Sequence, residues 1–273
     1  MVRQSESVVG DIEEALLGHW SHFGRWAHGA LVEDAGTVRY ETPIAQLPYN
    51  GVVRTWIRAD PERVIERVLD SFSSREVDFV WWHHPSALPR NLGERLTAHG
   101  LGLAEEAIGM SLDIRKRSRS ESSPPGLRLV EVKDKEQLRS YAELIFRYWE
   151  VPAESHALVE DINSYWGPAR APVHRWIVLD ESGLAIGKAL LSLAAPPGVA
   201  AIYGMSVTPE ARGRGVASAL THTLVDRAEA LGCHRVVLHA SEMAVRVYER
   251  AGFVKQCELP VYANAALWAS REN

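Results

Sequence analysis

Two glycines and two arginines, placed between an apolar run and an amphipathic one, are the residues best suited to chemistry in this sequence. Residues 199–207 predict a buried strand, and Val216 begins a helical pattern of apolar residues. The residues between them that matter are Arg212, Gly213, Arg214 and Gly215. Glycines allow close backbone approach to a ligand, and a helix N-terminus adds free N–H groups and about half a positive charge. The spacing therefore predicts a phosphate or pyrophosphate site, with the arginines as charged donors.

The loop differs from two common phosphate-binding patterns. It lacks the Gly-x-x-x-x-Gly-Lys-Ser/Thr of a P-loop, and Ala217 and the arginines do not fit a three-glycine dinucleotide loop. It does fit Arg/Gln-x-x-Gly-x-Gly/Ala through Arg212, Gly215 and Ala217. In this feature the chain resembles the GNAT superfamily of N-acyltransferases. The resemblance implies that this loop, with Val216 at the helix start, binds the pyrophosphate of an acyl-CoA.

A second segment carries the same resemblance. Residues 235–240 predict a short buried strand, and residues 241–252 predict a helix whose apolar stripe is Met243, Ala244, Val247 and Ala251. In GNAT proteins this helix has a small polar residue, an alanine three later, a tyrosine four after that, and then Gly-Phe. The matching residues here are Ser241, Ala244, Tyr248, Gly252 and Phe253. The resemblance implies that Ser241, Ala244 and Tyr248 border the donor site.

The chemistry follows from the resemblance. In the superfamily, two strands splay apart and their main-chain groups bond the pantetheine amides. The resemblance implies that Met205 and Val207 provide these main-chain groups here. The N–H of Met205 would also polarise the thioester carbonyl as an oxyanion donor. Tyr248 matches the tyrosine that protonates the departing thiolate, since a phenol of pKa about 10 suits an alkyl thiolate. A packed aromatic residue on a helix is the alternative for Tyr248.

The general base cannot be assigned from the sequence. An alkylammonium ion titrates near about 10.4, so a base or a water chain must take a proton before attack. The strand residues 200–206 contain no carboxylate. His239 is the best candidate by position, with a buried hydrogen-bonded histidine as the alternative. Glu242 is a second candidate, unless it only caps the following helix.

The acceptor side is expected around the segment that follows the first helix of this half. Glu150 and Glu154 are candidates for binding an ammonium group, with solvent exposure as the alternative for each. Trp149 and Trp166 are candidates for an aromatic wall, which would favour an apolar or aromatic amine, and Tyr203 is a further candidate for binding the substrate. Core packing is the alternative for most of the 9 tryptophans.

Composition limits the other possibilities. The 273 residues, 46% hydrophobic and 24% charged, suit one large globular domain or two ordinary ones. No apolar run approaches the roughly 20 residues of a membrane span, and residues 1–14 lack a signal-peptide core. With only Cys233 and Cys257, no disulfide framework is expected, so we expect a soluble cytoplasmic protein. A net charge of −5 gives nucleic-acid binding no support, and the oligomeric state is not predictable.

Metal binding is not predicted. His83 and His84 are adjacent in the sequence, and neither His-x-x-x-His nor Cys-x-x-Cys occurs.

Residues 115–126 divide the chain. They begin with the basic run 115–119, lack apolar residues from 118 to 123 and end in Pro-Pro-Gly, which predicts a solvated linker. Beyond the linker, strands are expected at 127–132, 175–180 and 185–193, and helices at 136–148 and 158–166. The resulting domains are 1–114, the linker 115–126, and a catalytic domain 127–273.

The N-terminal part predicts the same order as the last third of the chain. Strands at 52–57, 78–82 and 108–114 alternate with helices at 61–69 and 92–100. Its first strand-to-helix turn is Arg58-Ala59-Asp60-Pro61, which has no glycine, an acidic residue and a proline without an N–H group. The expected fold is therefore α/β: two GNAT-like mixed-sheet halves in tandem, with an intact acyl-CoA loop only in the C-terminal half.

The expected function is transfer of an acetyl group from acetyl-CoA, as co-substrate, to a small-molecule amine. One alternative is a GNAT-like transferase that takes an aminoacyl group from a charged tRNA to a small metabolite, against which the net charge argues. Another is a non-catalytic acyl-CoA sensor, against which the presence of Tyr248 argues.

Overall fold

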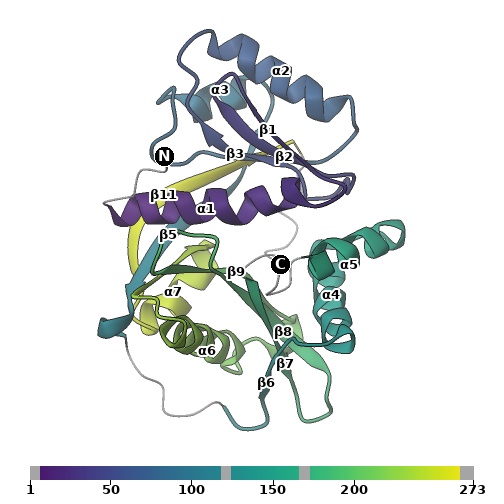
Figure 1. Cartoon of the computed structure of the whole chain (residues 1–273), viewed down its shortest axis with the longest axis vertical. Coiled ribbons are helices and arrows are strands. Elements are labelled where there is room, and N and C mark those ends of the chain that lie inside the picture. Colours follow the sequence, from purple (N-terminus) through teal and green to yellow (C-terminus); the bar gives the residue numbers. More distant parts are fainter. Residues whose placement is uncertain (1–6, 118–123, 166–172, 265–273) are drawn as a thin grey trace. The chain divides into compact units, whose positions relative to one another are not determined.

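The computed structural model describes residues 7–117, 124–165 and 173–264. These residues form two compact units (Figure 1). Unit 1 comprises Met1–Ala15 and Gly109–Gln256, and unit 2 comprises Leu16–Ile108 and Cys257–Asn273. The units do not coincide with the expected domains, because helix α1 (Val8–Arg25) and strands β5 (Gly102–Asp113) and β11 (Val254–Ala263) contribute residues to both.

Unit 1 contains a mixed sheet in the order β5-β10-β9-β8-β7-β6. The antiparallel strands are β6 (Arg128–Glu131), β7 (Val173–Leu179), β8 (Ala185–Ser192) and β9 (Val199–Val207). Strand β10 (Arg235–Ala240) pairs in parallel with β9. Strands β8 and β9 are almost continuously apolar because helices cover both faces of this sheet.

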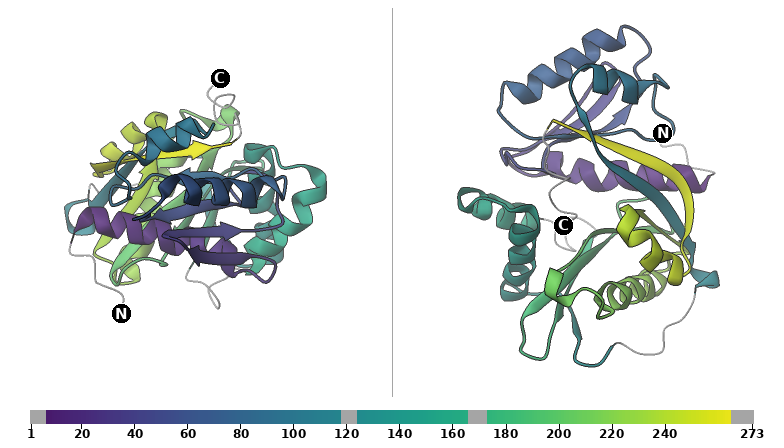
Figure 2. Two further views of the ribbon diagram at one scale, coloured as in Figure 1. Left: turned by 90° about the horizontal axis from the view of Figure 1, so that it is seen from above. Right: turned by 180° about the vertical axis from the view of Figure 1, so that it is seen from behind.

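The helices of unit 1 pack on opposite faces of its sheet (Figures 1 and 2). Lys188 of β8 lies over the ring of Tyr141 in α4 (Lys135–Trp149). Its neighbour Gly187 lies against Val216 and Leu220 of α6 (Val216–Ala230) on the other face. A Cβ on Gly187 would be only 2.7 Å from the Val216 side chain, so glycine permits this close packing. The remaining helices are α5 (His156–Tyr165) and α7 (Glu242–Arg250), with short 3₁₀ turns at Ile114–Lys116, Ala153–Ser155 and Pro209–Ala211.

Unit 2 contains strands in the order β1-β2-β3-β4-β11. A hairpin joins β1 (Ala30–Asp34) to β2 (Thr37–Glu41), and β3 (Gly51–Thr55) pairs antiparallel with β2 and parallel with β4 (Val80–Trp82). The last residues of β11 pair antiparallel with β4. Helices α2 (Pro61–Ser73) and α3 (Leu92–Ala98) flank β4 in the sequence.

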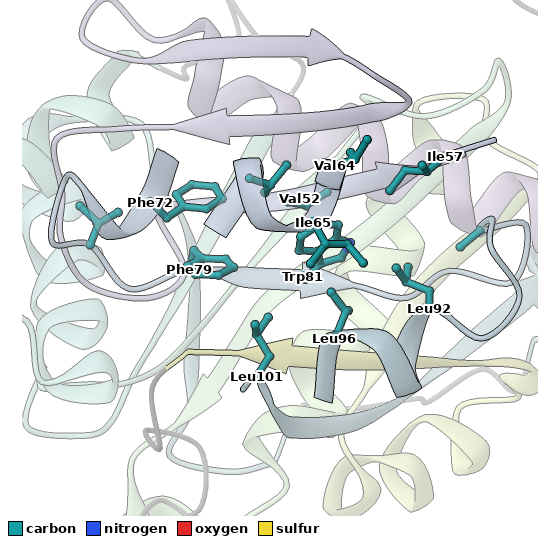
Figure 3. Close-up of a cluster of buried hydrophobic side chains, with 13 residues drawn as sticks. Val52, Ile57, Val64, Ile65, Phe72, Phe79, Trp81, Leu92, Leu96 and Leu101 are labelled. Atoms are coloured by element: carbon teal, nitrogen blue, oxygen red, sulfur yellow. The ribbon is translucent and has the colours of Figure 1, made fainter. Parts of the chain in front are cut away.

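A cluster of buried apolar side chains holds α2 and α3 on the sheet of unit 2 (Figure 3). Ile65 and Phe72 of α2 are fully buried, and Phe72 stacks on Phe79 with ring centroids 4.3 Å apart. Trp81 of β4 is also fully buried and donates its indole N–H to the Thr55 hydroxyl at 2.9 Å. This packing stabilises the strand-helix-strand-helix arrangement of unit 2.

Most of the predicted elements are confirmed within one to three residues, although β5 begins six residues earlier than expected. The apolar stripe predicted for residues 241–252 was wrong at Met243 and missed Val245, whereas Ala251 is buried and Ala244 and Val247 are half-buried. Met243 is 67% exposed, whereas Val245 and Tyr248 are the buried residues of α7. The sequence interpretation also missed α1, the β1–β2 hairpin and β11. Among the described residues, no helix combines the length and apolar character needed to cross a membrane.

Candidate active site

The loop between β9 and α6 has the backbone geometry that its glycines suggested. Gly213 and Gly215 both adopt the left-handed conformation, with φ of +76° and +80°. Gly215 is the N-cap of α6 and provides no side-chain cap, so the first N–H groups of the helix keep their capacity to bond a ligand. Arg212, Gly213 and Arg214 are exposed, and Ala217 is half-buried. An exposed helix N-terminus beside two arginines is suited to a phosphate group.

Strands β9 and β10 are paired only at their beginnings. Their parallel ladder runs from Val199↔Arg235 to Ile202↔Leu238. Residues 203–207 of β9 and 239–240 of β10 are still strand, but they lie beyond the ladder. Main-chain groups of Met205 and Val207 are therefore on a stretch of β9 that is not bonded to β10, and both residues are half-buried. Separated parallel strands provide main-chain donors and acceptors for an extended ligand.

Tyr203 and His239 stand at the point where the strands part. Each is the first residue beyond the ladder on its strand, and their ring centroids are 5.4 Å apart. Both nitrogens of the His239 ring are buried, and burial lowers the pKa of His239 to about 3. Burial also raises the pKa of the Tyr203 hydroxyl. The structure thus brings these two candidates together, but so weak a base as His239 is poorly suited to taking a proton from an ammonium ion.

Strand β9 contains a bulge next to this point. The β8–β9 register passes from Lys188↔Ser206 to Leu190↔Tyr203, so Gly204 and Met205 lie opposite the single residue Ala189. Gly204 is exposed and has a φ of +58°, which glycine adopts without strain. The Lys188 ammonium donates a hydrogen bond to the Gly204 carbonyl oxygen at 2.8 Å. The bulge therefore presents the Met205 peptide in an irregular stretch of strand.

The sequence did not predict a role for Lys188 or for its neighbours Tyr141 and Arg175. Lys188 is only 3% exposed, and its ammonium lies 5.1 Å from the ring centroid of Tyr141. Arg175 of β7 lies over the same ring at 5.7 Å. Burial and the charge of Arg175 lower the pKa of Lys188 to about 7. The available signal was a lone lysine inside the apolar run of residues 185–193.

Helix α7 carries the remaining donor-side candidates. Tyr248 is 4% exposed and packs edge-on against Phe253, with ring centroids 5.7 Å apart. Burial raises the pKa of its hydroxyl, so the phenol keeps its proton at neutral pH but is a weaker acid than the free phenol on which its expected role was based. Ser241 is the N-cap of α7 and makes no side-chain cap hydrogen bond, and Ala244 is half-buried one turn later. Glu242, in the first turn, is exposed.

The acceptor-side candidates lie at the end of α4 and just after it. Trp149 is half-buried and packs edge-on against Tyr148, with ring centroids 5.2 Å apart. Glu150 is the exposed C-cap of α4 with a φ of 49°, and Glu154 is exposed in the 3₁₀ turn Ala153–Ser155. Because both carboxylates are exposed, the binding of an ammonium group by Glu150 and Glu154 stays a prediction. Trp166 lies outside the described residues.

No group of three or more metal-ligating side chains occurs in the part of the chain that the structure describes.

The chain is similar to known proteins in both sequence and fold. Residues 130–253 match the model of the Acetyltransferase (GNAT) family. A mycothiol acetyltransferase of Paenarthrobacter aurescens (strain TC1) is 37% identical over 62 residues, which are 22% of this chain and 19% of that protein. The chain therefore spans less than a fifth of this relative's length.

Two solved structures share the fold over nearly the whole chain. A GCN5-related N-acetyltransferase from Kribbella flavida has a TM-score of 0.71 at 16% identity, covering 95% of this chain and 96% of that one. A tandem GNAT protein from the clavulanic acid biosynthesis pathway has a TM-score of 0.60 at 14% identity, covering 93% and 94%. The expected α/β fold with GNAT-like structural neighbours is confirmed, and the similarity to the GNAT family model is confined to residues 130–253, less than half of the chain.

Proposed function

We propose that the chain belongs to the GNAT family over residues 130–253 and transfers an acetyl group from acetyl-CoA to the amine of a small molecule by direct attack on the thioester. The observation that carries this proposal is the turn at the N-terminus of α6, with left-handed Gly213 and Gly215 and exposed residues 212–214, next to the part of β9 that β10 leaves unpaired. An anion site adjoining free strand edges suits a ligand with a pyrophosphate and an extended amide-bearing arm.

The residues present fit the donor. The pyrophosphate would bind main-chain N–H groups of Gly213, Gly215, Val216 and Ala217, with Arg212 and Arg214 as charged donors. The pantetheine arm would bond the main chain of β9 at Met205 and Val207. Ser241 and Ala244 would border the donor from α7.

Catalysis would use groups on β9 and α7. The Met205 N–H, displaced by the bulge, would bind the thioester oxygen as charge develops on it. The neutral amine attacks the carbonyl carbon, its nitrogen then loses a proton to water, and the C–S bond breaks as the tetrahedral intermediate collapses. Tyr248 would give its proton to the sulfur and recover one from solvent. Since His239 is a weak base, we propose that water takes the ammonium proton and that His239, with Tyr203, shapes the reaction site.

The acceptor would enter beside α4. Glu150 and Glu154 are exposed carboxylates at the end of that helix and would attract a cationic amine, with Trp149 as an apolar wall.

The domain organisation is also a proposal: residues 127–273 act as the catalytic half, and residues 1–114 are a degenerate copy joined by the linker 115–126. The order strand, helix, parallel strand, helix, strand in each unit supports that proposal.

The test has two stages. Mass spectrometry of ligand that co-purifies with the chain identifies the donor, and a library of small amines is then screened for CoA release from acetyl-CoA. We expect thiol release that depends on an amine in the wild type and is lost in the double variant Arg212→Ala, Arg214→Ala. The matched control is Arg115→Ala, Arg246→Ala, which removes two exposed arginines outside the loop. Amine-independent binding without release would favour a sensor, and a lack of acetyl-CoA binding would favour an aminoacyl-tRNA donor.

A further inference from the structure

A buried lysine is bonded to the bulge of β9. Lys188 lies on β8, and its Nζ donates to the Gly204 carbonyl oxygen at 2.8 Å. The bond crosses from Lys188 to the irregular part of the neighbouring strand, where the ladder between β8 and β9 changes register. Lys188 therefore supplies the hydrogen bond to a carbonyl that lies in the interrupted part of the ladder.

The carbonyl in question belongs to the same peptide unit as the Met205 N–H. The Gly204–Met205 peptide bond is trans and planar, so its C=O and N–H groups point in opposite directions. Fixing the carbonyl toward Lys188 consequently fixes the direction in which the Met205 N–H points. A cation on the carbonyl oxygen also polarises the amide and strengthens its N–H as a donor.

We propose that Lys188 is a positioning residue for the transfer reaction, which aims and polarises the Met205 N–H toward the oxygen of the bound thioester. This inference rests on the proposed function, because it needs an acyl thioester at β9. Lys188 does not itself touch the reacting atoms. It acts through one peptide unit.

The surroundings of Lys188 indicate that its charge is unfavourable for folding. The charged and titratable groups that face it are the Arg175 guanidinium from β7 and the Tyr141 phenol from α4. Its hydrogen-bonding partner on β9 is a neutral carbonyl. A buried ammonium beside a second cation destabilises the folded state relative to an apolar side chain of the same length. Such local conflicts between fold and residue type are typical of functional sites.

The experiment measures the thioester carbonyl directly in the full-length chain. Acetyl-CoA labelled with ¹³C at the acetyl carbonyl is bound, and the carbonyl stretch is recorded by infrared difference spectroscopy. Hydrogen bonding to the oxygen lowers this frequency relative to free acetyl-CoA. We expect Lys188→Met to remove about half or more of the wild-type shift while the dissociation constant of acetyl-CoA changes by less than about threefold.

Two measurements separate positioning from a structural role. The control Leu190→Met repacks the same face of β8 without touching the hydrogen bond, and it should keep the wild-type shift. The melting temperature of Lys188→Met should equal or exceed that of the wild type, because methionine removes a buried charge. A lysine needed only for packing would give a lower melting temperature and an unchanged carbonyl shift.

Each outcome decides the matter. A wild-type shift in folded Lys188→Met, or an equal loss of shift in Leu190→Met, would overturn the role of Lys188 and leave the proposed function intact. If the wild type does not bind acetyl-CoA, the proposed function fails and this inference fails with it. If Lys188→Met does not fold, Lys188→Gln decides: it keeps an N–H donor without the charge, and we expect a shift clearly below the wild-type value.

Discussion

The two units enter a helix by the same backbone conformation but with opposite chemistry. Unit 2 passes from β3 to α2 through Asp60, and unit 1 passes from β9 to α6 through Gly215. Both residues are left-handed N-caps, with φ of 46° and 80°, and neither makes a side-chain cap hydrogen bond. The turn of unit 2 adds a carboxylate and Pro61, whereas that of unit 1 adds two arginines. A left-handed N-cap residue is therefore common to both units, and the capacity to bind an anion depends on the other residues of the turn.

Strands β3 and β9 both extend past their parallel ladders, which end at Val52↔Trp81 and Ile202↔Leu238, but the bonding of their last residues differs. In unit 2, the main chain at the end of β3 is already bonded: the Thr55 N–H to the His84 ring at 3.0 Å and the Ile57 N–H to the Leu88 carbonyl at 2.9 Å. In unit 1, the corresponding part of β9 lies beyond its ladder with β10, beside Tyr203 and His239. An acyl-CoA arm would thus find main-chain partners at β9 and none at those two positions of β3.

The largest expected effect comes from filling the unit 1 turn. Gly213→Val should lower acetyl-CoA affinity by about 100-fold or more, because valine is strained at positive φ and its side chain occupies the space of the ligand. The matched control is Gly232→Val, since Gly232 has a φ of +81° and an equally open Cβ position away from the turn. If calorimetry finds an equal loss of acetyl-CoA affinity in both variants, backbone strain alone would explain the effect of Gly213→Val.

The helices that follow the second parallel strand sharpen the comparison, because α7, after β10, contains Tyr248, whereas the seven residues of α3, after β4, contain no tyrosine. Tyr248→Phe should lower kcat by about 10-fold or more, since the phenol gives its proton to the thiolate, while acetyl-CoA affinity stays unchanged. Steady-state kinetics with an acceptor from the amine screen checks this. Wild-type turnover in the variant would leave Tyr248 as a packing residue only.

A smaller effect is expected from pH. Burial lowers the pKa of Lys188 to about 7, so its ammonium is charged below that pH and loses its charge as the pH rises through it. Of the groups facing Lys188, Tyr141 has its pKa raised by burial to about 12 and Arg175 stays charged. The carbonyl shift of bound acetyl-CoA should therefore shrink as pH rises from about 6 to about 9. A constant shift over that range would contradict the role of the charge.

The smallest effect is expected in unit 2. Asp60→Gly relieves a left-handed aspartate but removes a carboxylate from the N-terminus of α2, and these changes oppose each other. Urea denaturation should show a change of less than about 1 kcal/mol in the free energy of unfolding, with acetyl-CoA affinity altered less than about twofold. A large loss of acetyl-CoA affinity in Asp60→Gly would indicate that acetyl-CoA binds in unit 2, contrary to the prediction.

Local sequence patterns predicted most of the helices and strands, but they did not predict the β1–β2 hairpin or strand β11. The period of residues 216–230 was readable, and Leu220 and Leu224 are fully buried as expected. The β1–β2 hairpin was missed because its two-residue turn is Ala35-Gly36, with alanine at a positive φ of 43°, instead of a residue typical of such turns. Strand β11 was missed because its pairing with β4 joins residues about 180 positions apart, for which the local sequence has no signal.

The candidate site was predictable where chemistry follows the main chain. Glycine and arginine spacing indicated the turn at 212–215, and the structure places both glycines in left-handed conformations. Lys188 was not predictable, because the bulge that brings Gly204 to it depends on the register of two strands. The weak basicity of His239 follows from its burial, which a single sequence does not reveal.

Titration calorimetry of acetyl-CoA into the full-length chain tests the contrast between the two turns most directly. We predict one site per chain, because of the two turns only the one at 212–215 has the glycines and the arginines, while the main chain near the other is bonded at Thr55 and Ile57. The site should disappear in Gly213→Val and persist in Asp60→Gly. Two equivalent sites, or a single site that survives Gly213→Val and is lost in Asp60→Gly, would contradict the account.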